Sequence, residues 1–251
     1  MLELLKEKHP APTHPIPPMP EYEHRTCPIS PEVILKTVRG LKNGTSSAVS
    51  GWTKELLRAA METDKSICSD FGVILARLLD GWADDLLHRC LVLSRLLALL
   101  KEKSDKEGKP VLDVRPIAIG ELFCKILGIW AFKASTPYVH PWQLGIGTPR
   151  GSITAYRDIM EWYRQGLALL TIDGKNAFNT TSRCKMWGKL VELDHVELMK
   201  YFRFAYAEPS DLVATTASGE FVFLPSQEGS RQGDGPAGYF FSLPLRPQGP
   251  L

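Results

Sequence analysis

An aspartate that directly follows a short apolar run is the residue in this sequence best suited to hold a metal ion. Residues 167–172 are apolar apart from one threonine, and Asp173 follows them, with Gly174 and Asn176 close behind. An apolar run of this length, bounded by turn-forming residues, predicts a buried strand that ends at Asp173. Divalent cations such as Mg²⁺ bind carboxylate oxygens held on a rigid element, so Asp173 is a candidate ligand. An aspartate that only stops a strand and caps a turn explains the same pattern.

Two further stretches contain a glycine and an arginine with distinctive chemistry. Gln232 and Gly233 lie beyond Asp173 in the chain, and Arg115 precedes a proline. A glycine lets a ligand approach the backbone closely because it has no Cβ atom. The planar guanidinium of arginine pairs with phosphate oxygens and stacks on bases. An Arg-Pro pair by itself is more often structural, so the chemistry depends on the three stretches occurring together.

Together these stretches resemble conserved motifs of the reverse transcriptases, especially those of non-LTR retrotransposons. Motif A of that family has an aspartate, two variable residues and then Asn-Ala-Phe, which appears here from Asp173 to Phe178. The core of motif B has a glycine and, after two residues, Gln-Gly-Asp, which appears from Gly229 to Asp234. The run that begins at Arg115 resembles the Arg-Pro-Ile of motif 2. The resemblance covers roughly residues 40–243 and implies the fingers and the first part of the palm of a polymerase.

The resemblance implies a role for each matching residue. In the family, two divalent ions about 4 Å apart activate a primer 3′-hydroxyl and stabilise the leaving oxygens. Asp173 is then the catalytic carboxylate and a ligand of Mg²⁺ or Mn²⁺, and the backbone carbonyl of Gly174 is a second ligand. Phe178 becomes the steric gate that favours deoxynucleotides. The remaining nucleotide contacts implied are Arg115, Gln232 and Gly233.

A lysine-rich turn suits contact with a nucleic-acid backbone. Residues 101–110 contain four lysines and three acidic residues between two apolar runs, which predicts a hairpin with a charged tip. Such a tip is usually only solvated. The resemblance places it over the substrate, so the implied template and primer contacts are Lys101, Lys103 and Lys109. The implied partners are an RNA template, a DNA primer and deoxynucleoside triphosphates.

The sequence also departs from the family. Gly235 separates the motif B aspartate from Pro236, where the family usually has proline at once. The paired aspartates of motif C do not follow Asp173, because the sequence has its single Asp-Asp at Asp84-Asp85. We therefore expect RNA-templated DNA synthesis in a parent element and inactivity of this chain by itself, with the remaining palm and thumb supplied by the same polypeptide. The alternatives are a non-catalytic nucleic-acid-binding remnant and a decayed product that does not fold stably.

Composition sets broad limits on the class of protein. The 251 residues are 44% hydrophobic and carry a net charge of +2, which is ordinary for a globular chain. Charged residues interrupt every apolar window between 70 and 100, so no membrane span is expected. Five widely spaced cysteines and no signal peptide predict reduced thiols and an intracellular protein that is not secreted. Nucleus and cytoplasm are equally compatible with these features.

The expected fold is α+β: polymerase fingers and a partial palm, with helices packed on a small antiparallel sheet and no thumb. We expect a proline-rich arm at 1–31, fingers at 32–165, the partial palm at 166–243 and a tail at 244–251. The arm is expected to be extended and to lie outside the core. Helices are predicted at 32–38, 54–62, about 70–88, 121–134, 152–164, 183–193, 195–207 and 238–243, and strands at 94–101, 111–119, 167–172, 212–216 and 220–224.

Overall fold

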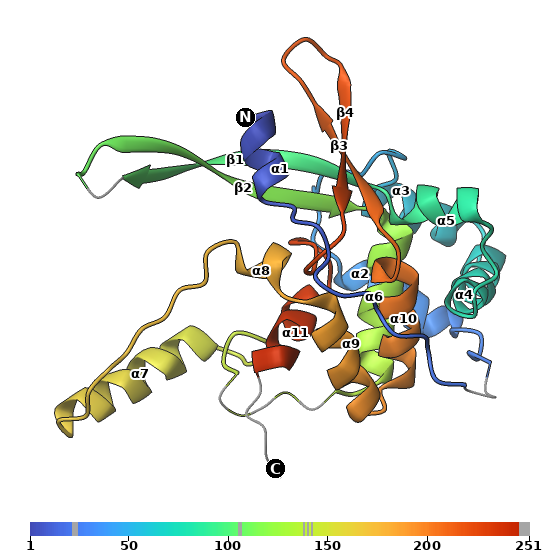
Figure 1. Ribbon diagram of the computed structural model, residues 1–251. Helices are drawn as coiled ribbons and strands as arrows, with labels where there is room; N and C mark the ends of the chain where they lie inside the picture. Colours follow the sequence, from blue (N-terminus) through green and yellow to red (C-terminus); the bar gives the residue numbers. More distant parts are fainter. Residues whose placement is uncertain (22–24, 105–106, 138, 140, 142, 246–251) are drawn as a thin grey trace.

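Two β-hairpins project from a body of packed helices (Figure 1). The computed structural model describes residues 1–21, 25–104, 107–137, 139, 141 and 143–245. Within these residues the chain is α+β, and four strands form one sheet in the order β2-β1-β3-β4. The helices are α1 (Leu2–Glu7), α2 (Pro31–Gly40), α3 (Lys54–Thr63), α4 (Ser66–Leu79), α5 (Asp85–Val92), α6 (Leu122–Ala134), α7 (Gly151–Arg164), α8 (Ala177–Thr180), α9 (Arg183–Glu192), α10 (Val196–Tyr206) and α11 (Ala237–Ser242). The strands are β1 (Ser94–Ser104), β2 (Pro110–Gly120), β3 (Ser210–Thr215) and β4 (Phe221–Ser226), and a 3₁₀ turn spans Leu243–Leu245.

The helical body is built around α6 and α10, and each contributes fully buried apolar residues to the core. Ile126 and Leu127 of α6 pack in the same cluster as Phe202 and Tyr206 of α10. Phe240 of α11 meets the Phe202 ring edge to face, with centroids 5.1 Å apart. Local sequence starts several of these helices, because the side chains of Ser30, Thr53, Asp84 and Ser182 each accept a hydrogen bond from a first-turn backbone N–H.

The sheet is mixed, which corrects the expectation of an antiparallel one. β1 and β2 form a long antiparallel hairpin, as do β3 and β4 over a shorter length. The two hairpins join where β1 runs parallel to β3, at the pairs Ser94–Leu212 and Arg95–Val213. Both strands leave a helix of the body, β1 after α5 and β3 after α10, and they start in the same direction. The parallel pairing follows from that shared origin.

The N-terminal segment is part of the folded core, contrary to the expected extended arm. Residues 2–7 form α1, and Leu5 is only 3% exposed. Leu5 belongs to a second apolar cluster with Leu96 of β1, Val114 of β2 and Leu212 of β3. Helix α1 therefore covers one face of the sheet where the two hairpins meet (Figure 1). The prolines that follow α1 explain why residues 10–21 form neither helix nor strand.

Two helix boundaries also differ from the prediction. The helix expected from about residue 70 to 88 is broken in two, with Asp80 ending α4 and Asp84 capping α5. The Asp84 side chain accepts from Leu87 N at 2.8 Å, so a new helix starts inside the apolar run. The helix predicted at 152–164 begins one residue earlier, at Gly151, after Arg150 in a left-handed conformation (φ 57°).

The strand predicted at 167–172 does not form. These residues lie in an exposed coil between α7 and α8, without sheet pairing. Leu170 and Ile172 are each 85% exposed. A strand needs a neighbouring strand to take its backbone hydrogen bonds, and the sheet described here provides none at this segment. The same exposure extends to α7, where the apolar side chains of Ile153, Ile159 and Trp162 are exposed.

Candidate functional site

The motif B segment lies against the edge of β2, the strand that carries Arg115. The backbone N–H of Ala118 donates to the carbonyl oxygen of Gln232 at 3.1 Å. Gly233 has φ +126°, and a Cβ atom there would lie 2.4 Å from the Ala118 carbonyl oxygen. Only glycine fits this close approach. The structure therefore brings Gln232 and Gly233 to the strand that presents Arg115.

The side chain of Arg115 lies on the open face of the hairpin. Val114 and Ala118 of β2 are buried beneath α1, whereas Arg115 is exposed. Side chains alternate between faces along a strand, so Arg115 shares its face with Ile117 and Ile119. Those two isoleucines line a cavity beside Gly233. Arg115 is thus directed to the same side of β2 as the cavity.

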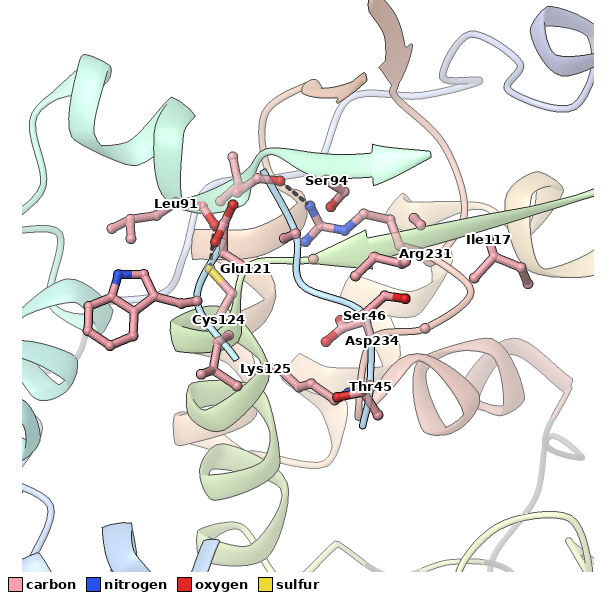
Figure 2. A pocket seen from close by; sticks show the side chains of 18 of the residues that line it. Thr45, Ser46, Leu91, Ser94, Ile117, Glu121, Cys124, Lys125, Arg231 and Asp234 are labelled. Carbon is pink, nitrogen blue, oxygen red and sulfur yellow. Dashed lines mark hydrogen bonds between the residues drawn. The ribbon is translucent and has the colours of Figure 1, made fainter. Parts of the chain in front are cut away.

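This cavity, of about 290 Å³, is enclosed by four segments that are distant in sequence. They are the loop before α3, the end of α5 with the start of β1, the end of β2 with the first turn of α6, and the motif B segment, and Tyr201 of α10 also lines the cavity. In the view of Figure 2, Ser94 and Arg231 lie above Thr45 and Lys125. The Ser94 hydroxyl is buried and, within the described part of the chain, has no hydrogen-bond partner. No local sequence pattern indicates this cavity, since its walls come from segments far apart in the chain.

The charged groups around the cavity are mostly engaged in the fold. Glu121 accepts hydrogen bonds from the backbone and hydroxyl of Ser50, and the Lys54 ammonium donates to the carbonyl oxygens of Arg39 and Leu41 at the end of α2. Burial raises the pKa of the Cys124 thiol to about 12, so it stays protonated at neutral pH. A thiolate nucleophile is therefore not available at Cys124.

Beneath the motif B segment lies a buried polar network that the sequence reasoning missed. The Arg231 guanidinium donates to the carbonyl oxygens of Val92 (2.7 Å) and Ala205 (3.2 Å) and lies 4.8 Å from the centre of the Tyr206 ring. The Asp234 carboxylate accepts from the hydroxyls of Tyr201, at 2.7 Å, and Tyr206. Burial and the Asp234 charge both raise the pKa of Tyr206, which therefore donates as a neutral phenol. Contacts on both sides thus fix the backbone of Gln232 and Gly233.

Motif A contacts motif B through Phe178. The N–H of Ser230 donates to the Phe178 carbonyl oxygen at 2.8 Å. Gly229, with φ +67°, passes so close that a Cβ atom would lie 2.1 Å from that oxygen. Phe178 is half-buried in α8, and the preceding Asn176 adopts a left-handed conformation (φ 55°). The structure therefore brings together Phe178, the motif B backbone and the strand of Arg115.

Asp173 and Gly174 stand apart from this arrangement. Both are exposed in the coil before α8, not at the end of a strand. Among the described residues, no three His, Cys, Asp or Glu side chains gather where they could hold a metal ion. One carboxylate and one backbone carbonyl do not make a two-ion site, so the two-ion site predicted from the sequence would need further oxygen ligands beside Asp173.

The predicted template contacts lie at the tip of the β1–β2 hairpin. Lys101 in β1 and Lys109 before β2 are exposed. Lys103 pairs with Val111 in the strand register, and its side chain lies outside the described part of the chain. Lys101 pairs with Asp113, and Leu99 pairs with Arg115, so Lys101, Arg115 and Arg95 have positions on the same face.

Comparison of the chain with models of known protein families and with curated protein sequences finds no match in either. In the described part of the chain, no helix has both the length and the apolar character needed to cross a membrane. All five cysteines are unpaired.

Proposed function

We propose that this chain forms the fingers and the first part of the palm of a reverse transcriptase, and that it takes part in RNA-templated DNA synthesis. The observation that carries the proposal is the Ala118–Gln232 hydrogen bond of 3.1 Å, which joins the Arg115 strand to the motif B segment. The resemblance assigns both segments to the incoming nucleotide. Phe178, the proposed gate, touches the same segment through Ser230. Residues far apart in sequence but assigned to one ligand are therefore neighbours.

The open face of the β1–β2 hairpin supports a polyanionic partner. Arg95, Lys101 and Arg115 have positions on it beside exposed aliphatic side chains. Asp113, the acidic residue that pairs with Lys101 across the hairpin, forms an ion pair with Lys8 at 2.8 Å. The face is thus basic and largely free of competing carboxylates, which suits nucleic-acid phosphates.

The exposed segment between α7 and α8 supports the view that more palm strands belong beside it. Residues 167–172 have the apolar character of a central strand, which is normally covered on both faces. In the proposed polymerase, the remaining palm and thumb come from the same polypeptide and pair with this segment. Mg²⁺ or Mn²⁺ is then held by Asp173, the Gly174 carbonyl and further carboxylates of that part.

A second candidate is a nucleic-acid-binding module without catalysis. The observation that favours it is the isolation of Asp173, which in the described residues belongs to no cluster of metal ligands. Both candidates bind a template–primer, but they differ in extension of the primer. For the 251-residue chain we expect no extension on an RNA template with Mg²⁺ or Mn²⁺, since two ions need more than one carboxylate. Extension that Asp173→Asn abolishes would contradict this and assign the missing ligands to another source.

The decisive binding experiment measures the affinity of the chain for an RNA template annealed to a DNA primer, by fluorescence anisotropy at several salt concentrations. We expect affinity to fall steeply as the salt concentration rises. Arg115→Ala and Lys101→Ala should each reduce the slope of log affinity against log salt concentration by roughly one counterion. Lys65→Ala is the matched control, because Lys65 is exposed between α3 and α4, away from the hairpin. Absence of binding at low salt, or equal slopes in all variants, would refute the proposal.

A further inference from the structure

One buried carboxylate joins three distant parts of the chain next to the proposed nucleotide site. Glu228 is 5% exposed and immediately precedes Gly229. Its Oε1 accepts from the backbone N–H of Arg183 (2.6 Å) and of Gly229 (3.4 Å). Its Oε2 accepts from the backbone N–H (2.8 Å) and the hydroxyl (3.2 Å) of Thr13. Both oxygens therefore have hydrogen bonds, as a buried carboxylate requires.

Glu228 and Arg183 hold the peptide groups around Gly229 from two sides. The carboxylate accepts from Gly229 N–H, while Nε of Arg183 donates to the Gly229 carbonyl oxygen at 2.9 Å. The other guanidinium nitrogens of Arg183 donate to the carbonyl oxygen of Tyr206 and the hydroxyl of Ser226. Burial lowers the pKa of Arg183 to about 10, so it remains charged at neutral pH. These hydrogen bonds fix the Gly229 backbone, which packs against the carbonyl oxygen of Phe178.

The N-terminal segment connects Glu228 to motif A and to β2, the strand that carries Arg115. The Lys8 ammonium pairs with Asp113 of β2 at 2.8 Å, two residues before Arg115. The Lys8 carbonyl oxygen accepts from Nδ2 of Asn176 at 2.7 Å, two residues before Phe178. Thr13, five residues further on, binds Glu228. Residues 8–13 thus contact each of the three segments that carry proposed nucleotide contacts.

We infer that Glu228 is a positioning residue which, with residues 8–13, sets the spacing between Arg115, Phe178 and Gln232-Gly233 for the incoming deoxynucleoside triphosphate. The inference rests on the proposed function. Glu228 does not itself touch the nucleotide. It acts through the Gly229 backbone and through Thr13, so its loss should affect nucleotide recognition more than the phosphate contacts of the hairpin.

Two measurements on Glu228→Gln test this role. The first is hydrogen–deuterium exchange of the ligand-free chain. Because the new amide presents a donor to N–H groups, exchange should rise roughly tenfold in both 176–184 and 228–234. Thr13→Val, which removes only the hydroxyl donor, should produce a smaller rise in the same two segments. An increase confined to residues next to 228 would overturn the inference.

The second measurement is the gain in template–primer affinity caused by the complementary deoxynucleotide, relative to a mismatched one. In Glu228→Gln this gain should fall about fivefold or more, while affinity without nucleotide and its salt slope stay within about twofold. Asp80→Asn is the matched control, because Asp80 also ties the N-terminal segment to the body, through Thr26 and Lys200. An equal loss in both variants would indicate a purely structural role and overturn the inference.

The failure of the proposed function can be told apart from failure of this inference. A wild-type chain that does not bind template–primer contradicts the proposed function. The exchange measurement needs no ligand, so it still decides whether Glu228 couples the two motifs. If residues 176–184 and 228–234 both remain protected from hydrogen exchange in Glu228→Gln, the inference is refuted, even when the chain binds template–primer.

Discussion

The ring of Phe178 stacks on the ring of Phe241, with centroids 4.9 Å apart and planes inclined by 22°. Phe178 belongs to α8 and Phe241 to α11, so the contact joins the motif A turn to the helix after motif B. If Phe178 is a steric gate, Phe241 is the surface that supports it. The orientation of the gate then depends on a residue that no motif identified.

The stack predicts a measurable coupling between the two rings. Phe178→Ala and Phe241→Ala should each lower the free energy of unfolding by about 1–3 kcal/mol, since both rings are partly buried. The double variant should show a coupling of about 0.5–1.5 kcal/mol. Chemical denaturation measures all four proteins. Strictly additive losses would show that the rings contribute separately.

Replacement of Arg231 should be among the most damaging single changes. Arg231→Met leaves the carbonyl oxygens of Val92 and Ala205 without their donor and Asp234 without a nearby positive charge. Loss of one partner from a buried charged network costs about 3–5 kcal/mol. Thermal and urea unfolding measure this loss. Arg157→Met, at an exposed site on α7, is the control and should change stability by about 0.5 kcal/mol or less.

The exposed segment before α8 should govern solubility without governing stability. Leu170→Lys with Ile172→Lys replaces two apolar side chains that are each 85% exposed. Static light scattering should show less self-association, because contiguous exposed apolar surface promotes it. The midpoint of unfolding should stay unchanged, since neither side chain packs in the body. A large drop in that midpoint would mean that the segment is buried in solution.

His9 predicts a dependence of stability on pH. Burial lowers the pKa of His9 below 6.5, more than the hydrogen bond to the Leu5 carbonyl oxygen raises it. As pH falls through 6.5 the unfolded chain binds a proton before the folded chain does, so the free energy of unfolding decreases between 6.5 and the lowered pKa. Urea unfolding at pH 7.5 and 5.5 should show this decrease in the wild type.

The matched variants isolate that effect. His9→Gln should remove this part of the pH dependence, whereas His14→Gln should retain it, because His14 is exposed. The protection factors for hydrogen exchange in residues 2–9, which correct for the intrinsic rate at each pH, should decrease at the lower pH only when His9 is present. An unchanged pH profile in His9→Gln would assign the dependence to other groups.

Local patterns predicted those elements whose cause is local. The amphipathic spacing at 54–62 and 121–134 predicted two helices, and the structure confirms them at Lys54–Thr63 and Leu122–Ala134. The charged turn between two apolar runs likewise predicted the β1–β2 hairpin. These elements arise from side-chain periodicity and turn residues within a few positions of one another.

Features that depend on distant partners were not predictable in this way. The run at 167–172 has the composition of a strand, but pairing is a property of its neighbours and not of the run itself. Helix α1 was overlooked because the prolines after it dominate the segment, although Leu2 and Leu5 have helical spacing. Nothing near Glu228 in the sequence points to Thr13, which is 215 positions away. The site network could be found only in three dimensions.

The narrow join between the two hairpins has a mechanical consequence. β1 and β3 pair at only two positions, while β1 continues for nine residues beyond Arg95, a lever of roughly 30 Å. A rotation of about 10° about this join would move the lysine-bearing hairpin tip by roughly 5 Å. At Arg115, which pairs with Leu99, four residues along β1 from Arg95, the same rotation gives a displacement of only about 2 Å. Such a rotation therefore displaces the hairpin tip more than twice as far as the level of Arg115.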